Sequence, residues 1–228
     1  MVFRRDESAA PYTKTVCAGT PEDGIAKLAA EWTCPLSLEQ IARVAAFFRL
    51  LLQWNARVNL TGAGGMDELI AHHLPDSFAL SRLVPSGFTV VDIGAGGGLP
   101  GVPFAILRPD CKTTLVEPRA KRTAFLGAAL RGCGRPDLFE VVRGRDADVS
   151  AASFRVAASR ATFAPLEWLT LAGRLLIPGG RAVVFASRAP AGGEGEWCLV
   201  DSVSYLVGHG AARWAGAYVP RGTIAVPA

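Results

Sequence analysis

The chain has 228 residues, of which half are hydrophobic and 19% are charged, a balance that is typical of globular proteins and excludes a fibrous or fully disordered chain. No apolar run approaches the length of a membrane span, and the five cysteines include no Cys-x-x-Cys pair, which argues against a zinc site or a redox dithiol. The net charge of +4 and the pI near 9 permit a nucleic-acid partner without requiring one. We therefore expect a soluble, cytoplasmic protein with free thiols and no membrane association.

The first 85 residues predict helices and no strands. Residues 1–20 are polar, lack the apolar segment of a signal peptide, and are expected to form a disordered arm. Residues 21–85 predict a helical extension, in which Ser37 and Gln40 have the spacing of a capping box. Pro75 is expected to end or kink one helix, and Asp76 to cap the next. The expected helices are Gly24–Trp32, Leu38 to about Trp54, Met66–Leu74 and Ser77–Leu83.

Residues 86–228 alternate between strand and helix patterns, which predicts an α/β domain with a mostly parallel, twisted sheet and helices on both faces. Pro178 to Gly180 is expected to form a turn, and Ala189–Glu196 a mobile loop. A closing antiparallel pair is expected from two late segments, Trp197–Val207 and Gly222–Val226. The expected strands of the parallel part are Thr89–Ile93, Lys112–Glu117, Leu138–Arg143, Phe154–Ser159 and Arg181–Ala186. The expected helices between them are Val102–Leu107, Lys121–Arg131 and Pro165–Leu176.

A glycine-rich loop follows the first predicted strand and identifies the candidate binding site. Its glycines Gly94, Gly96 and Gly98 give Gly-x-Gly-x-Gly, whereas a dinucleotide-binding loop needs Gly-x-Gly-x-x-Gly, and the position of its third glycine is taken by Leu99. Asp92 precedes this loop, where a carboxylate suits a cationic ligand and would repel a diphosphate. S-adenosylmethionine (SAM) carries an ammonium and a sulfonium and no phosphate. The loop therefore favours SAM over NAD.

Further candidates lie at the ends of the next strands, because ligands of open α/β sheets bind past the carboxyl ends of the strands. Glu117 follows the second strand by the spacing of a ribose-binding acid. Asp146 and Ala147 follow the third strand, where backbone groups could contact an adenine. Arg160 follows the fourth strand, and a structural ion pair explains it as well as a place at the substrate edge does.

Basic residues and histidines give weaker signals. Lys121 and Arg122 open a predicted helix, where cations are electrostatically unfavourable unless an acid or an anionic partner compensates them. His72, His73 and Asp76 have no matching His or Cys elsewhere, so we expect no metal and favour a hydrogen-bonding or capping role at the junction with the sheet domain.

From Ser37 to Ser187 the chain resembles the bacterial small-subunit (16S) ribosomal RNA guanine-N7 methyltransferases, also called glucose-inhibited division protein B. Seven blocks in the same order carry the resemblance, and the Gly-Leu-Pro-Gly ending of the glycine loop is specific to it. The blocks are Trp54 to Thr61, His73 to Ser77, Asp92 to Gly101, Thr114 to Glu117, Lys121 to Leu126, Ser159 to Ala161 and Pro178 to Gly180.

The resemblance implies a Rossmann-like, SAM-dependent methyltransferase fold and methylation of N7 of one guanine in 16S ribosomal RNA, either free or in the 30S subunit. It implies that the cofactor is held at positions matching Gly94, Leu99, Asp146, Ala147 and Arg160. The family usually has a glutamate in place of Ala147, and a Lys-Gly pair after the fifth strand, where this chain has a serine followed by Arg188. We expect Arg188, with Lys121 and Arg122, to contact the RNA, and we expect a monomer.

Three other functions remain open from the sequence. The chain could be a SAM-dependent methyltransferase of a small molecule or a protein, or a non-catalytic RNA-binding relative that keeps the fold. A NAD-dependent dehydrogenase is the least favoured, because of Leu99. The residue that stabilises the methylated, positively charged purine cannot be named from the sequence.

Overall fold

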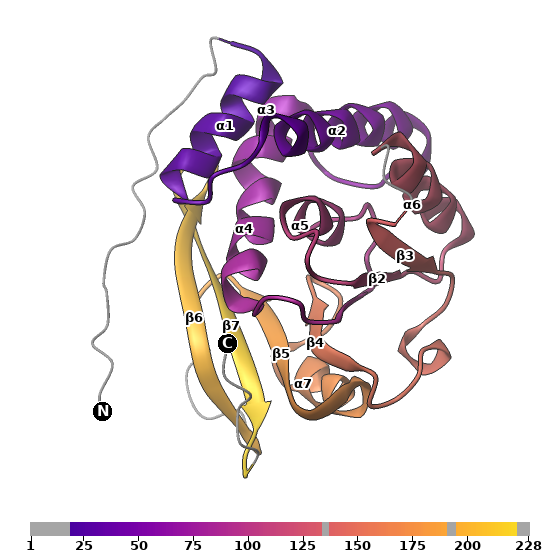
Figure 1. Ribbon diagram of the computed structural model, residues 1–228, viewed down its shortest axis with the longest axis vertical. Coiled ribbons are helices and arrows are strands. Elements are labelled where there is room, and N and C mark those ends of the chain that lie inside the picture. Colours follow the sequence, from indigo (N-terminus) through magenta and orange to yellow (C-terminus); the bar gives the residue numbers. More distant parts are fainter. Residues whose placement is uncertain (1–18, 134–136, 191–194, 223–228) are drawn as a thin grey trace.

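The computed structural model describes residues 19–133, 137–190 and 195–222 of the chain, which form a seven-stranded sheet with helices on both faces (Figure 1). The strand order is β3-β2-β1-β4-β5-β7-β6. Strands β1 to β5 are parallel, and β7 pairs antiparallel with both β5 and β6. This confirms the α/β class with a mostly parallel sheet. The strands are β1 Val90–Ile93, β2 Thr113–Val116, β3 Phe139–Val142, β4 Phe154–Ser159, β5 Leu176–Ala186, β6 Trp197–Val207 and β7 Ala211–Pro220.

The helices begin with an N-terminal group and continue between the strands. The helices are α1 Pro21–Glu31, α2 Leu38–Val58, α3 Met66–Glu68, the π-helix Leu69–His73, α4 Leu74–Leu83, α5 Gly101–Leu107, α6 Ala120–Gly132, the 3₁₀ turn Asp146–Asp148 and α7 Pro165–Leu175. The expected arm at residues 1–20 falls almost wholly on residues 1–18, outside the described residues. In the described part of the chain, no helix has the length and apolarity to cross a membrane.

The N-terminal helices differ from the sequence prediction in four respects. Helix α1 begins three residues early, because Thr20 and Asp23 form a capping box. The predicted capping box of Ser37 and Gln40 is present, but α2 continues to Val58. Pro75 does not end a helix, because it lies in the first turn of α4, where its missing N–H is not needed. Asp76 is buried inside α4 and is not a cap.

The C-terminal strands also differ from the prediction. The partner of β6 is β7 at Ala211–Pro220; Gly222 lies in a turn, and the rest of the expected strand lies outside the described residues. Pro178 to Gly180 is no separate turn, because β5 already begins at Leu176 and runs through these residues as a bulge. Part of the expected mobile loop, residues 191–194, is also outside the described residues.

The two faces of the sheet are packed by different elements. Val90 of β1 and Val156 of β4 belong to a core that also includes Phe48 of α2 and Phe78 of α4. Their neighbours in sequence, such as Val91, point to the opposite face, where α7 covers the sheet. The N-terminal helices therefore share one core with the sheet. A domain boundary near residue 85 stays a prediction.

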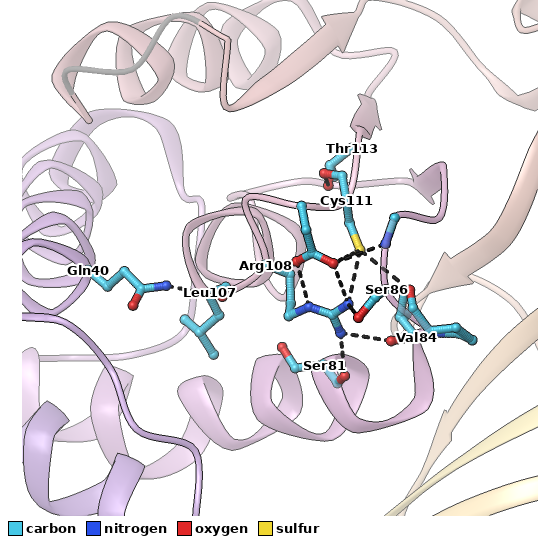
Figure 2. A network of polar contacts seen from close by, with 11 residues as sticks. Gln40, Ser81, Val84, Ser86, Leu107, Arg108, Cys111 and Thr113 are labelled. Carbon is cyan, nitrogen blue, oxygen red and sulfur yellow. Dashed lines mark hydrogen bonds and ion pairs between the residues drawn. The ribbon is translucent and has the colours of Figure 1, made fainter. Parts of the chain in front are cut away.

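Polar side chains hold the ends of α4 and α5 in place (Figure 2). Nε2 of Gln40 donates to the carbonyl oxygens of Ile106 and Leu107, the last residues of α5, over 3.0 and 3.1 Å. The guanidinium of Arg108 donates to the carbonyl of Val84, just after α4, over 2.7 Å and pairs with Asp110. These bonds satisfy carbonyls that a helix end leaves without a partner. They fix α5, whose first residue follows the glycine loop.

Candidate functional site

The glycine loop between β1 and α5 is held by close backbone contacts. The N–H groups of Gly94 and Ala95 both donate to the carbonyl oxygen of Val116, at the end of β2, over 2.9 and 3.0 Å. Gly94 has φ +74°, and a Cβ atom there would lie 2.7 Å from Oγ1 of Thr162. Gly98 has φ +76°, and a Cβ atom there would lie 2.6 Å from Val102. Only glycine fits these positions without displacing a neighbour.

The carboxylate of Glu117 is fixed against this loop. It lies at the end of β2 and is 3% exposed. Its Oε2 accepts from the backbone N–H of Gly96 over 3.0 Å, and its Oε1 accepts from the N–H of Arg119 over 2.8 Å. Each carboxylate oxygen can accept a second hydrogen bond. Glu117 is therefore held rigidly, with acceptor capacity left for a pair of ligand hydroxyls.

A cavity of about 540 Å³ opens at the carboxyl ends of the parallel strands. This volume lies in the range of small-molecule sites. Three residues that the sequence predicts as cofactor contacts line it: Gly94, Glu117 and Asp146. Arg122 and Thr162 line it as well. The structure therefore brings together predicted residues from the ends of three strands.

The other predicted cofactor residues lie around this cavity and do not line it. Gly98 and Leu99 are buried, and Leu99 belongs to the core that the N-terminal helices share with the sheet. Gly96 contacts the cavity wall through its bond to Glu117. Ala147 is exposed in the 3₁₀ turn next to Asp146. Their assignment as cofactor contacts stays a prediction.

Asp92 lies in a different environment from the one expected. It is 1% exposed, and its Oδ2 has no hydrogen-bond partner among the described residues. A Cβ atom on Gly101 would lie 2.6 Å from this oxygen, so the start of α5 encloses it. Burial raises the pKa of Asp92 to about 7, and the charge of Arg160 only partly opposes this effect. Asp92 therefore stays partly protonated near pH 7 and is not an open carboxylate that faces the cavity.

Arg160 joins a partly buried polar cluster at the junction of the N-terminal helices and the sheet. Its Nη1 donates to Oδ2 of Asp76 over 2.7 Å and to Nδ1 of His73 over 3.0 Å. Asp76, which is 1% exposed, also accepts from the hydroxyl of Tyr205 over 2.8 Å and from Nη1 of Arg213 over 2.6 Å. We call these five residues the Asp76 cluster. It confirms the hydrogen-bonding role expected of the histidine and the aspartate.

Sequence reasoning did not find Tyr205 and Arg213. They lie 129 and 137 positions after Asp76, on β6 and β7. No local spacing links them to α4, and β7 itself was not predicted. In the described residues, no group of His, Cys, Asp or Glu is arranged to hold a metal ion. The four described cysteines, which exclude Cys17, are free.

The predicted RNA contacts lie at the same edge of the sheet as the cavity. Lys121 is exposed in the first turn of α6, and Arg122 both lines the cavity and donates to the carbonyl of Asn59 over 3.3 Å. Arg188 is exposed shortly after the carboxyl end of β5. Their contacts with RNA stay a prediction.

Comparisons with known proteins point to one family. The family model GidB, described as rRNA small subunit methyltransferase G, matches residues 40–191. A ribosomal RNA small subunit methyltransferase G from Neisseria meningitidis serogroup C (strain 053442) is 37% identical over 150 residues, which are 66% of this chain and 72% of that protein. The protein of the same name from Aromatoleum aromaticum (strain DSM 19018 / LMG 30748 / EbN1) is 36% identical over 178 residues and covers 76% of this chain and 82% of its own.

Solved structures share the fold at low sequence identity. A mutant of MtNAS superposes with a TM-score of 0.54 at 15% identity, covering 86% of this chain and 78% of its own. The tRNA methyltransferase TrmK of B. subtilis superposes with a TM-score of 0.51 at 13% identity, covering 67% of each chain. At these identities the likeness concerns the fold alone.

Proposed function

Because this chain belongs to the GidB family of ribosomal RNA small subunit methyltransferases G, we propose that it transfers a methyl group from SAM to N7 of one guanine in 16S ribosomal RNA. Family membership makes the chain a SAM-dependent ribosomal RNA methyltransferase. The N7 position and the residues that act there are our inference. The observation that supports SAM binding at this site is the cavity at the strand ends, lined by Gly94 of the glycine loop and by Glu117.

The residues of this cavity fit SAM. At Gly94 the backbone comes so close to Thr162 that no side chain could stand between them, which leaves main chain as the wall of the site. Glu117 would hold the two ribose hydroxyls with the acceptor capacity it has left. The backbone of Asp146 and Ala147 would contact the adenine. Arg160 would lie at the edge where substrate arrives.

Methylation of guanine N7 requires little acid–base catalysis from the protein. SAM supplies a methyl group on a sulfonium, which is a good leaving group. Guanine N7 has a lone pair and no proton, so no side chain needs to act as a general base. The protein has to hold the purine in line and exclude water, which is catalysis by orientation. A carbonyl or carboxylate near the purine would stabilise the positive charge of the product.

Ribosomal RNA would be bound mainly through its phosphates. Lys121, Arg122 and Arg188 supply cations at the edge of the sheet that holds the cavity. Arginine and lysine contacts to phosphate release counterions, so binding should weaken steeply with salt. We further propose that the enzyme acts as a monomer in the cytoplasm.

Mapping of N7-methylguanine in 16S ribosomal RNA by mass spectrometry, in strains with and without this gene, tests the function. We expect one N7-methylguanine to disappear on deletion and to return when purified protein and SAM are added to 30S subunits or to naked RNA. A small-molecule or protein substrate would be favoured if deletion left the methylation of 16S ribosomal RNA unchanged and the purified protein added no methyl group to it. RNA binding without any SAM binding by calorimetry would favour a non-catalytic relative.

A further inference from the structure

The Asp76 cluster holds the Nη1 group of the Arg160 guanidinium and leaves the donors on Nη2 and Nε for a ligand. Both recorded bonds of the Arg160 side chain, to His73 and to Asp76, are made by Nη1. No acceptor for its Nη2 or Nε appears among the described residues, and the side chain is 21% exposed. A guanidinium held in this way presents its remaining donors in a fixed direction.

The chemistry of the contact fixes the state of His73. Arginine has only donors, so Nδ1 of His73 must be an acceptor and the ring must be neutral. The ring proton then lies on Nε2, which is 3.4 Å from Oγ1 of Thr61, in the loop after α2. Burial, together with the charges of Arg160 and Arg213, lowers the pKa of His73 to about 4, which agrees with a neutral ring at physiological pH.

The backbone that carries His73 is unusual and is fixed from the far end of the chain. His73 ends the π-helix Leu69–His73, and such turns often occur at functional sites. The carbonyl oxygen of Ala71 inside this turn accepts from the N–H of Gly208, between β6 and β7, over 2.9 Å. A Cβ atom on Gly208 would overlap the ring of His72, so the two segments are in direct contact. The hairpin that provides Tyr205 thus also supports the turn that carries His73.

We propose that His73 and Tyr205 are positioning residues for Arg160: His73 holds its guanidinium directly, and Tyr205 fixes the Asp76 carboxylate that holds it. The proposal rests on the proposed function, in which Arg160 lies at the substrate edge of the SAM site. The free donors of Arg160 would bind an anionic group, either the carboxylate of SAM or a phosphate of the RNA. Neither His73 nor Tyr205 needs to touch the ligand.

Four variants of the full-length protein test this positioning. H73L removes the acceptor for Arg160, whereas H73N keeps an acceptor oxygen near the place of Nδ1. Y205F removes only the hydroxyl that donates to Asp76. R160A measures the full effect of the guanidinium, and H209N serves as the matched control because His209 is exposed and outside the cluster. The readouts are the melting temperature, the Kd for SAM by calorimetry, and kcat and KM with 30S subunits.

We expect R160A to weaken binding of one anionic ligand by at least about tenfold, the usual effect of a lost hydrogen bond to a charged group. H73L should lose about tenfold and Y205F about threefold for the same ligand, while H73N recovers most of the H73L loss. A change confined to the Kd for SAM identifies the SAM carboxylate as the anion, and one confined to the KM for 30S subunits identifies an RNA phosphate. H209N should match the wild type.

Other results distinguish the role of Arg160 from the positioning roles of His73 and Tyr205. Wild-type values for R160A would overturn the role of Arg160 in the proposed function. An impaired R160A beside wild-type values for H73L and Y205F would overturn the positioning proposal alone. Equal losses in H73N and H73L would also overturn it, because the acceptor would then not be what matters. If H73L fails to fold, H73N and Y205F still decide: Y205F with wild-type affinity for both ligands would overturn it.

Discussion

A Cβ atom on Gly97 would lie 2.8 Å from the carbonyl oxygen of Leu60, so the loop after α2 rests directly on the glycine loop. Because the obstacle is backbone, it cannot rotate away. We expect G97A to lower the free energy of unfolding by about 1–3 kcal/mol, the usual cost of overpacking. Urea denaturation measures it. A Cβ atom on Gly127, in α6, would meet only the end of the Arg131 side chain, at an ordinary contact distance of 3.6 Å, so G127A should instead stabilise by about 0.5–1 kcal/mol. If G97A were as stable as the wild type, the loop after α2 would not be in contact with the glycine loop.

A bulky residue in place of Gly94 should impair SAM binding without unfolding the protein. In G94V the new side chain would meet Thr162 at the wall of the cavity, so SAM affinity should fall below detection by calorimetry while the far-UV spectrum stays native. Gly87 also has a positive φ, but its surroundings are open and it precedes β1. G87A therefore carries similar backbone strain away from the cavity and should bind SAM normally. Normal SAM affinity in G94V would exclude this cavity as the cofactor site.

SAM affinity should depend on the charge of Glu117 as well as on its acceptor oxygens. E117Q keeps one acceptor oxygen but loses the charge, and E117A loses both. We expect SAM affinity to fall about tenfold in E117Q and more in E117A, because hydrogen bonds to charged groups are the stronger ones. Glu140 is exposed on β3, and E140Q is the matched control. An E117Q with unchanged Kd would mean that the carboxylate only holds Gly96 and Arg119.

Two buried groups should give the stability of the protein opposite dependences on pH. The pKa of Asp92 is raised from 3.8 to about 7, so its favourable contribution is complete below pH 3.8 and is lost as the pH rises through 7. The pKa of His73 is lowered from 6.5 to about 4, so its contribution is complete above pH 6.5 and is lost as the pH falls through 4. In the wild type the two dependences partly cancel between pH 4 and 6.5.

Substituting either Asp92 or His73 should reveal the pH dependence that the other residue gives to the stability. D92N should be more stable than the wild type at pH 8, by about 4 kcal/mol, and its stability should rise more steeply from pH 4 to 6.5. H73N should show the reverse, a stability that falls as the pH rises toward 7. Denaturant titrations at five or six pH values measure both curves. Parallel curves for wild type and D92N would mean that Asp92 titrates normally.

The salt dependence of RNA binding tests the proposed contacts of Lys121, Arg122 and Arg188. Each phosphate contact that is lost should reduce the slope of log K against log salt by about 1. We expect K121A and R188A to weaken RNA binding without changing the Kd for SAM. R122A should weaken the binding of both RNA and SAM, because Arg122 lines the cavity. Filter binding at several salt concentrations gives the slopes. A wild-type slope in all three variants would place the RNA on another surface.

Local sequence patterns predicted the part of the fold that depends on local physics. The β-branched run before Gly94 became β1, and the capping box of Ser37 and Gln40 opens α2 as expected. The π-helix was missed because periodicity over five residues does not distinguish it from an α-helix. Strand β7 was missed because its alanines and Gly216 have low strand propensity. The fold selects a small residue there, since Trp214 lies 2.1 Å from where a Cβ atom would be.

The site was predictable where its residues follow strands directly. Gly94, Glu117 and Asp146 meet in one cavity because the carboxyl ends of parallel strands lie at one edge of a sheet. The burial of Asp92 was not predictable, because it depends on how closely α5 approaches β1 at Gly101. Two partners of Asp76, Tyr205 and Arg213, were not predictable either, because they lie on strands 129 and 137 positions further along the chain.

The single core shared by the N-terminal helices and the sheet limits how far the protein can be trimmed. A fragment starting at residue 86 would lose the aromatic side chains of α2 and α4 that belong to the same core as Val90 and Phe104. It would also lose Asp76, the acid that pairs with Arg160. Exchanging that first segment for the one of a relative would therefore change the surroundings of Arg160 as well as the packing of the sheet.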